Sequence, residues 1–353
     1  MKLLKKLTTT PGIPGREHRV RQVILEQIDG LFEDVRVDAM GSIIAVKKPT
    51  RSSPKPLRVM LAAHMDQIGF MVKHIDDKGF LRINSVGGFD TRNLFARMCT
   101  ICPDVRNPDN DLKGVLNPGG KPIHISDPQE RKKIPEVNEL TVDLGLPLEQ
   151  VRERVKIGDM VVLDAPAQKV GETFVSQCLD NRVACWIAIR AIEKLRSHNC
   201  EIHCVFTVQE EVGIRGAETS AFSVKPDIGI GIDTTLCVDT PGVPEDMRTT
   251  KQGHGAALTV MDSSTISDLD LLENFESIAK EKEIPYQRSI LTRGGTDSAS
   301  IQRAGPGARV LTLSCPTRYI HTVTEMVHLN DLNACCSLLT AYLSRAKQES
   351  NPS

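Results

Sequence analysis

Strand-like and helix-like segments are interleaved along the C-terminal half of the chain, and this order constrains the fold more than any other feature of the sequence. Short apolar runs of strand length are separated by longer segments whose apolar residues recur at helical spacing. The strand-like runs span residues 201–208, 226–233, 254–261 and 308–314, and the helix-like segments span residues 181–199, 269–283 and 329–346. Interleaving of this kind predicts an α/β sheet with helices on both faces.

The N-terminal part of the chain supplies further pieces of the same sheet. Residues 17–31 carry apolar side chains at helical spacing and predict an amphipathic helix, whereas the Pro- and Gly-rich start before them predicts no helix. Residues 34–48 contain two β-rich runs around Gly41, a pattern typical of a hairpin. The nearly continuous apolar run at residues 56–63 then predicts a buried central strand.

A different pattern separates these two regions. Between about residues 73 and 165, short β-like runs alternate with Gly, Pro, Asn and Asp, and only residues 147–155 favour a helix. The chain has 353 residues, more than the roughly 250–300 that a single hydrophobic core usually organises. We therefore predict one α/β domain made of residues 1–72 and 166–353, with a small β module of residues 73–165 inserted into it.

The charge balance argues against several classes of partner. With 44 Lys and Arg against 45 Asp and Glu, the formal net charge is −1. Nucleic-acid binders usually carry a basic excess, and membrane-surface proteins carry a basic amphipathic face. The first residues lack the long apolar segment of a signal peptide, and no run approaches the roughly 18 apolar residues that would span a bilayer. We therefore expect a soluble, cytoplasmic protein that binds neither nucleic acid nor membrane.

Ten cysteines are scattered along the chain, and in a cytoplasmic protein we expect their thiols to be reduced. Cys99 and Cys102 form the one Cys-x-x-Cys pair. A four-cysteine zinc site would need a second such pair, which the sequence lacks, and the flanking residues favour a strand. We therefore interpret both cysteines as structural.

Residues that can bind metals follow the predicted strands. They are His64 and Asp66, Glu210 and Glu211, Asp233, and His321, with Asp180 directly before a predicted helix. In open α/β sheets, functional groups gather outside the carboxyl ends of the strands, so these side chains can converge although they lie far apart in the sequence. Any one of them alone would more often be a turn residue or a helix cap. So many ligand-type residues at the ends of buried strands indicate a site.

This residue set has the chemistry of a two-metal centre. Two imidazoles and three carboxylates suit divalent ions such as zinc, cobalt or manganese, and five ligands exceed what one tetrahedral catalytic ion needs. The five are His64, Asp180, Glu211, Asp233 and His321. Two ions about 3.5–4 Å apart would fit if one aspartate bridged them. Because Glu210 and Glu211 are adjacent, we expect one to be a ligand and the other to be a general base. Asp66, on the same face of a strand as His64, is expected to orient that imidazole.

Four other histidines lack this context. His203 lies inside a predicted strand, His124 in the β module and His328 near a helix start, and we interpret all three as structural. His254 lies between two glycines in a turn, where it would contact a substrate only if the turn lies near the crevice.

Short motifs surround the candidate ligands and extend beyond them. They are AHMDQIGF at 63–70, CLDNR at 178–182, EEVGIRG at 210–216, IDT at 232–234, GGTD at 294–297 and PTRYIH at 316–321, with VGGFD at 86–90 and VDLG at 142–145 in the β module. Together they resemble the dinuclear metallo-aminopeptidases that include glutamyl, deblocking and tetrahedral aminopeptidases, within the clan of co-catalytic zinc exopeptidases. The resemblance runs nearly end to end.

This resemblance implies a fold and an activity. The implied fold is a three-layer α/β/α phosphopeptidase-like catalytic domain carrying an inserted small β-barrel, often compared to a PDZ domain, that helps to build a homo-oligomer such as a tetrahedral dodecamer. The implied activity is removal of N-terminal residues from short peptides by a water that two divalent metal ions activate, with zinc expected before cobalt or manganese. By similarity, His64 and Asp233 would hold one ion, Glu211 and His321 the other, Asp180 would bridge, Glu210 would be the general base and Asp66 the orienting acid.

Two segments, residues 261–272 and the N-terminal turn, depart from the family pattern and leave the substrate preference open. Glycines at 294 and 295 allow close approach of the backbone to a substrate, and Thr296 or Asp297 can cap a helix. We take Gly295 and Thr296 as candidate substrate contacts.

Three other functions remain as alternatives. The first is a metal-dependent deacylase or carboxypeptidase of the same clan. The second is a glycosidase, which fits poorly because sugar grooves are usually lined with aromatic side chains and the chain is only 4% aromatic. The third is a non-catalytic homologue, which the intact set of seven site positions disfavours.

Overall fold

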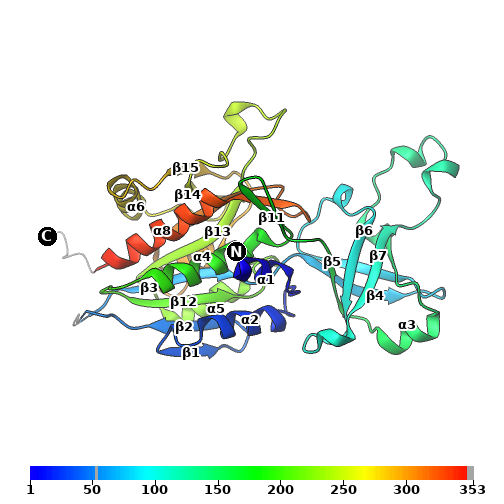
Figure 1. The fold of residues 1–353 in the computed structure, drawn as a ribbon, viewed down its shortest axis with the longest axis horizontal. Helices are drawn as coiled ribbons and strands as arrows, with labels where there is room; N and C mark the ends of the chain where they lie inside the picture. The colour runs from blue at the N-terminus through cyan, green and yellow to red at the C-terminus, as the bar shows by residue number, and fades with distance from the viewer. Residues whose placement is uncertain (52–54, 348–353) are drawn as a thin grey trace.

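The computed structural model describes residues 1–51 and 55–347, which form a larger lobe and a smaller lobe (Figure 1). The strands of the larger lobe are β1 (Asp34–Val37), β2 (Ile43–Lys47), β3 (Arg58–His64), β10 (Gln168–Val170), β11 (Thr173–Ser176), β12 (Glu201–Thr207), β13 (Ile228–Leu236), β14 (Ala256–Met261), β15 (Tyr286–Ile290), β16 (Arg309–Arg318) and β17 (Glu325–His328). They form one sheet in the order β1-β2-β12-β3-β13-β16-β17-β11-β10, and β14 joins β15 to β16. The central strands β12, β3, β13 and β16 are parallel, so their carboxyl ends lie at one edge.

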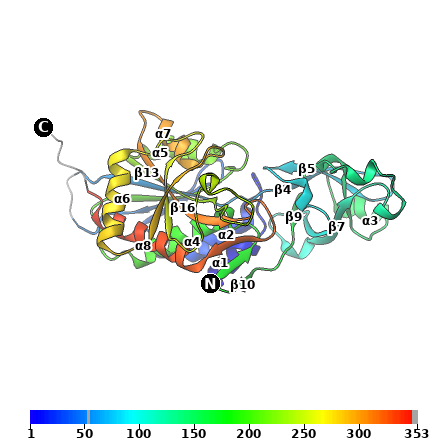
Figure 2. The same ribbon diagram turned by 90° about the horizontal axis from the view of Figure 1, so that it is seen from above.

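Helices cover both faces of this sheet (Figure 2). One face packs against α1 (Lys2–Thr9), α2 (His18–Ile28), α4 (Leu179–Lys194), α6 (Leu269–Glu281) and α8 (Leu329–Arg345), and the other against α5 (Arg215–Val224) and α7 (Asp297–Arg303). This arrangement confirms the three-layer α/β/α domain predicted from the sequence.

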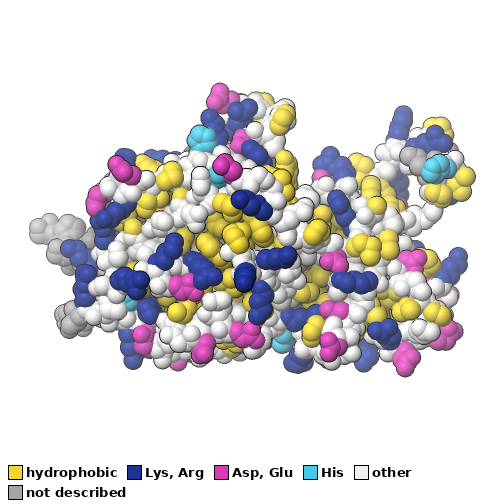
Figure 3. Space-filling model, viewed as in Figure 1, with side chains coloured by type: hydrophobic (Ala, Val, Ile, Leu, Met, Phe, Trp, Pro, Cys, Tyr) yellow, Lys and Arg dark blue, Asp and Glu magenta, His cyan; other side chains and the backbone are white. Residues whose placement is uncertain are grey.

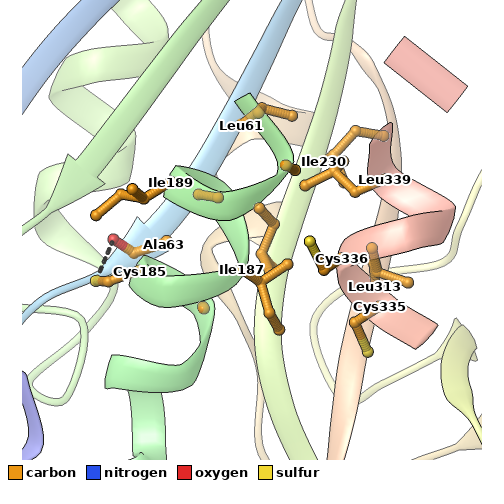
Figure 4. Close-up of a cluster of buried hydrophobic side chains, with 14 of the residues drawn as sticks. Leu61, Ala63, Cys185, Ile187, Ile189, Ile230, Leu313, Cys335, Cys336 and Leu339 are labelled. Carbon is orange, nitrogen blue, oxygen red and sulfur yellow. Dashed lines mark hydrogen bonds between the residues drawn. The ribbon is translucent and has the colours of Figure 1, made fainter. Parts of the chain in front are cut away.

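The core beneath α4 and α8 holds the parallel strands in place (Figure 4). Ile187 of α4 and Leu339 of α8 pack with Leu61, Ile230 and Leu313 from β3, β13 and β16, and all five side chains are fully buried. Burying each such side chain stabilises the fold by about 1.5–3 kcal/mol. The strand ends that carry the candidate ligands therefore emerge from a densely packed layer.

The smaller lobe is a closed six-stranded barrel, as predicted. Its strands are β4 (Gly69–Ile75), β5 (Leu81–Val86), β6 (Arg97–Cys102), β7 (Leu112–Pro118), β8 (Leu140–Asp143) and β9 (Met160–Leu163), closed in the order β4-β5-β8-β7-β6-β9, with α3 (Leu148–Arg154) at one side. The barrel has its own core, which includes Phe70, Ile101 and Val142. Because Gly69 already pairs with Val86, the predicted boundary at residues 72 and 73 falls inside β4.

The connections carry short 3₁₀ turns. Within the described residues these are η1 (Thr91–Asn93), η2 (Pro108–Asn110), η3 (Ile123–Ile125), η4 (Glu130–Lys132), η5 (Val137–Glu139) and η6 (Glu245–Met247). Among residues 1–51 and 55–347, no helix is long and apolar enough to cross a membrane.

The start of the chain corrects the sequence analysis, which predicted no helix before residue 17. Residues Lys2–Thr9 form α1, whose buried side chains Leu3, Leu4 and Leu7 lie at helical spacing and pack next to α4. The Pro and Gly residues that suggested an irregular start begin only at Pro11. A helix this short is marginal alone, so its packing against α4 stabilises it.

Cys99 and Cys102 both lie in β6, where their side chains are buried in two different clusters. Burial raises the pKa of each thiol to about 12, so both stay protonated near neutral pH. Protonated thiols on different faces of one strand cannot share a metal ion, which agrees with the structural interpretation.

Arg182, in α4, joins this helix to the N-terminal segment. It is fully buried, and its guanidinium donates hydrogen bonds to the carbonyl oxygens of Leu7 (2.6 Å), Thr10 (3.0 Å) and Gly12 (3.4 Å). It also donates to Oε1 of Gln67 at 3.3 Å. One side chain thereby links the end of α1 and the turn after it to α4 and to the loop after β3.

We predict that Arg182→Met destabilises the protein strongly. The carbonyl oxygens of Leu7, Thr10 and Gly12 would each lose a hydrogen bond from the charged guanidinium, although backbone N–H groups still donate to Leu7 (3.4 Å) and Gly12 (3.0 Å). A hydrogen bond to a charged group contributes about 1.5–3 kcal/mol, so the free energy of unfolding should fall by at least about 3 kcal/mol. The control is Arg190→Met in the same helix, which removes a partly exposed ion pair with Glu193 and should cost less than about 1 kcal/mol. Denaturant unfolding followed by circular dichroism measures both, and equal losses would contradict the role of Arg182.

Candidate metal centre

The candidate ligands meet at the carboxyl edge of the parallel strands. His64 is the last residue of β3, Glu210 and Glu211 follow β12, and His321 follows β16. All four line one pocket of about 550 Å³. The structure thus brings together residues from strands that are distant in the sequence.

The two aspartates of the set complete the pocket. Asp233 lies inside β13, which continues to Leu236, so it is not at the strand end as predicted. Asp180 stands at the start of α4, but its φ of −76° and ψ of 105° are not helical, so the regular helix begins beyond it. Both side chains are largely buried, with 12% of Asp180 and 7% of Asp233 exposed.

Asp180 presents one oxygen to each of two imidazoles. Its Oδ1 lies 3.3 Å from His64 Nε2, and its Oδ2 lies 3.7 Å from His321 Nε2. Asp233 Oδ1 lies 3.9 Å from His64 Nε2, and Glu211 Oε2 lies 3.4 Å from His321 Nε2. His64, Asp180 and Asp233 form one group of ligand atoms within 4.8 Å of one another, and Asp180, Glu211 and His321 form a second. The two groups share Asp180.

Glu210 lies beside these groups. Its Oε2 is 3.7 Å from His64 Nε2, and it forms a third close group with His64 and Glu211. The adjacent glutamates therefore both reach the pocket, as expected for residues just past a strand end.

The pocket gathers more negative than positive groups. Burial raises the pKa of Asp233 and Glu210 well above the usual range, and neighbouring carboxylates add to this rise against the opposing effect of His64. Burial alone would lower the pKa of His321, but Glu211 and Asp180 outweigh it and raise the pKa to about 9. The raised pKa values of the two carboxyl groups and of His321 all mean that the pocket favours added positive charge. A donor set of imidazole nitrogens and carboxylate oxygens fits divalent ions of the zinc, cobalt and manganese type.

Asp66 fixes the backbone of both glutamates. Its fully buried carboxylate accepts hydrogen bonds from the backbone N–H groups of Glu210 at Oδ1 and Glu211 at Oδ2, both at 3.1 Å. The same Oδ1 lies 3.5 Å from Nδ1 of His64. Asp66 was expected on the same strand face as His64, but β3 ends at His64 and Asp66 reaches the imidazole from the loop beyond it.

Glu325 performs the matching task on the other side of the pocket, and the sequence analysis missed it. Its buried carboxylate accepts hydrogen bonds from the backbone N–H of Asp180 (2.9 Å, Oε2) and of His321 (2.8 Å, Oε1). Burial, reinforced by the charge of Asp180, raises its pKa to about 8. A signal was available, because Glu325 alternates with the apolar Val327 and so shares the buried face of β17.

Gly295 and Thr296 also line the pocket, as expected for candidate substrate contacts. Thr296 is the N-cap residue of α7, but its side chain does not cap the helix and its Oγ1 lies 3.1 Å from Oγ1 of Thr312. Asp297, the first residue of α7, accepts a hydrogen bond from Thr207.

The remaining histidines of the sequence analysis lie outside the lining of this pocket. His203 contacts Glu201 at 2.8 Å within β12, and His328 caps α8 by accepting from Asn330 N–H. His124 and His254 are exposed.

Comparison with known proteins gives consistent relatives. A family model described as M42 glutamyl aminopeptidase matches residues 41–338. A putative aminopeptidase of Acetivibrio thermocellus is 37% identical, over 96% of this chain and 96% of its own length. A lysyl aminopeptidase of Pyrococcus furiosus is 31% identical, over 98% of this chain and 97% of its own. The TET1 peptidase of Pyrococcus horikoshii, described as assembling into a tetrahedron or a large octahedral shell, matches with a TM-score of 0.86 and 31% identity, over 98% of this chain and 99% of that one.

The position of Glu325 predicts a role in metal affinity. In Glu325→Gln the amide keeps one acceptor oxygen, so it can hold only one of the two backbone N–H groups, and we expect Zn²⁺ to bind about ten- to hundredfold more weakly. Calorimetric titration of metal-free protein with Zn²⁺ measures this. Glu172→Gln, which changes an 87% exposed carboxylate near His328, is the matched control. Unchanged affinity in Glu325→Gln would contradict the positioning role.

Proposed function

The chain belongs to the M42 glutamyl aminopeptidase family and is a metal-dependent aminopeptidase, and from this premise we propose which residues carry its reaction. The proposed reaction releases the N-terminal residue of a short peptide by means of a water that two divalent metal ions activate. The observation that carries the two-ion proposal is the shared carboxylate of Asp180, which offers one oxygen to each of two imidazoles.

Each proposed ion has its own group of ligands. His64 and Asp233 would hold one ion, Glu211 and His321 would hold the other, and Asp180 would be shared between them, an assignment supported by two of the groups of close ligand atoms. Zinc is the first candidate, and cobalt and manganese accept the same donors. When bound, such ions polarise the scissile carbonyl and make the attacking water more acidic.

Glu210 is the proposed general base. Its side chain reaches the pocket but belongs to neither proposed ligand group, and the hydrogen bond from its N–H to Asp66 fixes its backbone. Its carboxylate takes a proton from the attacking water and gives it to the leaving amine as the peptide bond breaks. Asp66 orients His64, and Gly295 and Thr296 contact the substrate.

The alternatives are less well supported. The family and relatives are described as aminopeptidases, which disfavours a deacylase or carboxypeptidase. Among the described residues that line the pocket none is Phe, Tyr or Trp, whereas sugar grooves usually contain them. A non-catalytic homologue would not be expected to keep all seven site positions, of which six line one pocket and the seventh, Asp66, accepts hydrogen bonds from two of them.

We propose that the chain forms a homo-oligomer, such as a tetrahedral dodecamer, through the inserted barrel of residues 73–165. The description of the similar TET1 peptidase supports this. So do exposed apolar side chains on the insert, at Met98, Val115, Ile125, Ile134 and Ile157. Figure 3 displays apolar atoms on this lobe and on the segment between β7 and β8 that projects from it. The ten unpaired cysteines support a reducing compartment, the cytoplasm.

The names of the relatives leave the preferred N-terminal residue open. The family description names glutamyl residues, whereas the Pyrococcus furiosus relative is a lysyl aminopeptidase, and the two side chains have opposite charge.

We predict that Glu210→Gln lowers kcat on alanine p-nitroanilide at least about a hundredfold while the metal content is unchanged, because the amide cannot accept the proton. Steady-state rates and atomic emission of the same samples measure the two quantities. Glu218→Gln, which alters an exposed glutamate of α5, should behave as wild type. Full activity of Glu210→Gln would show that the base lies elsewhere.

Removal of metal should abolish activity, and the substrate's free amine should be required. After chelation, trialanine should no longer be hydrolysed, and added zinc, cobalt or manganese should restore the rate to different extents. N-acetyl-trialanine should resist the metal-loaded enzyme. Chromatography measures the cleavage of both peptides. Cleavage of the acetylated peptide in preference to the free one would favour the deacylase instead.

A further inference from the structure

A second large cavity lies where the two lobes meet, and it shares no lining residue with the pocket of the candidate metal centre. Its volume is about 590 Å³. One wall comes from residues within 9–11 and 18–23 of the larger lobe, and the other from residues within 105–111 of the insert. We call this cavity the junction pocket. Cavities of about 300–1,000 Å³ are large enough to hold small ligands.

Three arginines and one acidic residue line the junction pocket within the described parts of the chain. They are Arg19 and Arg21 of α2, and Arg106 and Asp111 of the insert. The two carboxylate oxygens of Asp111 accept hydrogen bonds from Arg19, each at 2.7 Å, so these two charges compensate each other. The charges of Arg21 and Arg106 have no such counterpart in the lining, which leaves an excess of two positive charges.

The guanidinium groups of Arg21 and Arg106 have donors to spare. Among residues 1–51 and 55–347, the Arg106 side chain makes no hydrogen bond or ion pair, and only its backbone N–H donates, to Oδ1 of Asp104 at 2.8 Å. Within the same ranges the Arg21 side chain makes one hydrogen bond, from Nη1 to the carbonyl oxygen of Gly41 at 3.1 Å. Each guanidinium carries five N–H donors, so both can bind an anion from outside the chain.

The imidazole of His18, which also lines the junction pocket, responds to this charge. Burial lowers the pKa of His18, and the positive charges of Arg21, Arg106 and Arg16 lower it further. His18 is therefore mostly neutral at pH 7 and adds no charge of its own. The same field that disfavours a cation at His18 favours an anion in the pocket.

The two walls of the junction pocket are already fixed to each other. Besides its pair with Asp111, Arg19 donates hydrogen bonds to the carbonyl oxygens of Asp104 (2.6 Å) and Val105 (3.2 Å) on the insert. The side chains of Arg19 and Asp111 are only 10% and 18% exposed. Little ordering of the backbone therefore remains to be done when a ligand enters.

We propose that the junction pocket binds a phosphate group, which bridges the two lobes through Arg21 and Arg106. A phosphate monoester carries a charge of about −1.5 to −2 near pH 7, which matches the excess positive charge of the lining. Its oxygens accept hydrogen bonds in the two-point geometry that a guanidinium offers. The same group comes from two sources, free inorganic phosphate and the phosphate monoester of a small molecule. The inference is independent of the proposed aminopeptidase function, because it uses no residue of the metal centre.

Calorimetric titration of the metal-loaded protein compares the two sources. The probes are inorganic phosphate and glycerol 3-phosphate, and glycerol is the uncharged control. We expect saturable binding of a phosphate probe and no binding of glycerol. Tighter binding of glycerol 3-phosphate would assign the pocket to a monoester, and tighter binding of inorganic phosphate would assign it to the free ion. Because phosphate also binds metal ions, the titration is repeated after chelation, and binding at the junction pocket should persist.

Variants locate the binding. Arg106→Met and Arg21→Met should each weaken phosphate binding about ten- to hundredfold, because each removes hydrogen bonds between charged groups. Arg196→Met removes an exposed arginine outside the pocket lining and is the matched control, which should bind phosphate as wild type does. Circular dichroism confirms that each variant is folded. In metal-free samples, phosphate should raise the melting temperature of wild type more than that of Arg106→Met.

Four outcomes would overturn the inference. The first is that wild type binds neither phosphate probe. The second is binding that disappears on chelation and is unchanged in Arg106→Met, which would place the phosphate at the metal centre. The third is an equal loss of affinity in Arg106→Met and Arg196→Met, which would reflect net charge alone. The fourth is dissociation of an oligomer in Arg106→Met, seen by light scattering, while wild type binds no phosphate, which would indicate that an acidic segment of a second copy fills the pocket.

Discussion

Two buried carboxylates, those of Asp66 and Glu325, fix the backbone of the residues that form the candidate metal site. Each accepts backbone N–H groups from two residues that carry pocket side chains, Asp66 from Glu210 and Glu211 and Glu325 from Asp180 and His321. A buried carboxylate is stable only when hydrogen bonds compensate its desolvation, so these bonds satisfy the carboxylates and restrain the backbones at once. The convergence of candidate ligands from four strands depends on these hydrogen bonds.

The parallel strands at the centre of the sheet make that arrangement possible. β12, β3, β13 and β16 end at one edge, and the packed layer beneath them limits how far each end can move. The chain enters the inserted barrel just after β3 and returns to the larger lobe just before β10. A whole domain can therefore be added without disturbing the strand ends that carry the candidate ligands.

The sequence was sufficient where local patterns decide the structure. The apolar runs of β3, β12 and β13 predicted the sheet, and the residue types that follow them predicted which side chains converge at the candidate metal site. It was insufficient where a partner distant in the chain decides. α1 forms because Leu4 and Leu7 can pack with α4, and Glu325 matters because Asp180, far away in sequence, donates to it. The barrel begins at Gly69 because of its pairing with Val86, which no local pattern reveals.

Arg182 links the first twelve residues of the chain to the residues beside the candidate metal site. Its guanidinium donates to the carbonyl oxygens of Leu7, Thr10 and Gly12 and to the side chain of Gln67, while its own backbone lies two residues after Asp180. Gln67 adjoins Asp66, so the chain next to both Asp66 and Asp180 is held by a segment whose residues do not line the pocket of the metal site. Trimming or unfolding residues 1–12 would therefore loosen that pocket without removing any of the residues that line it.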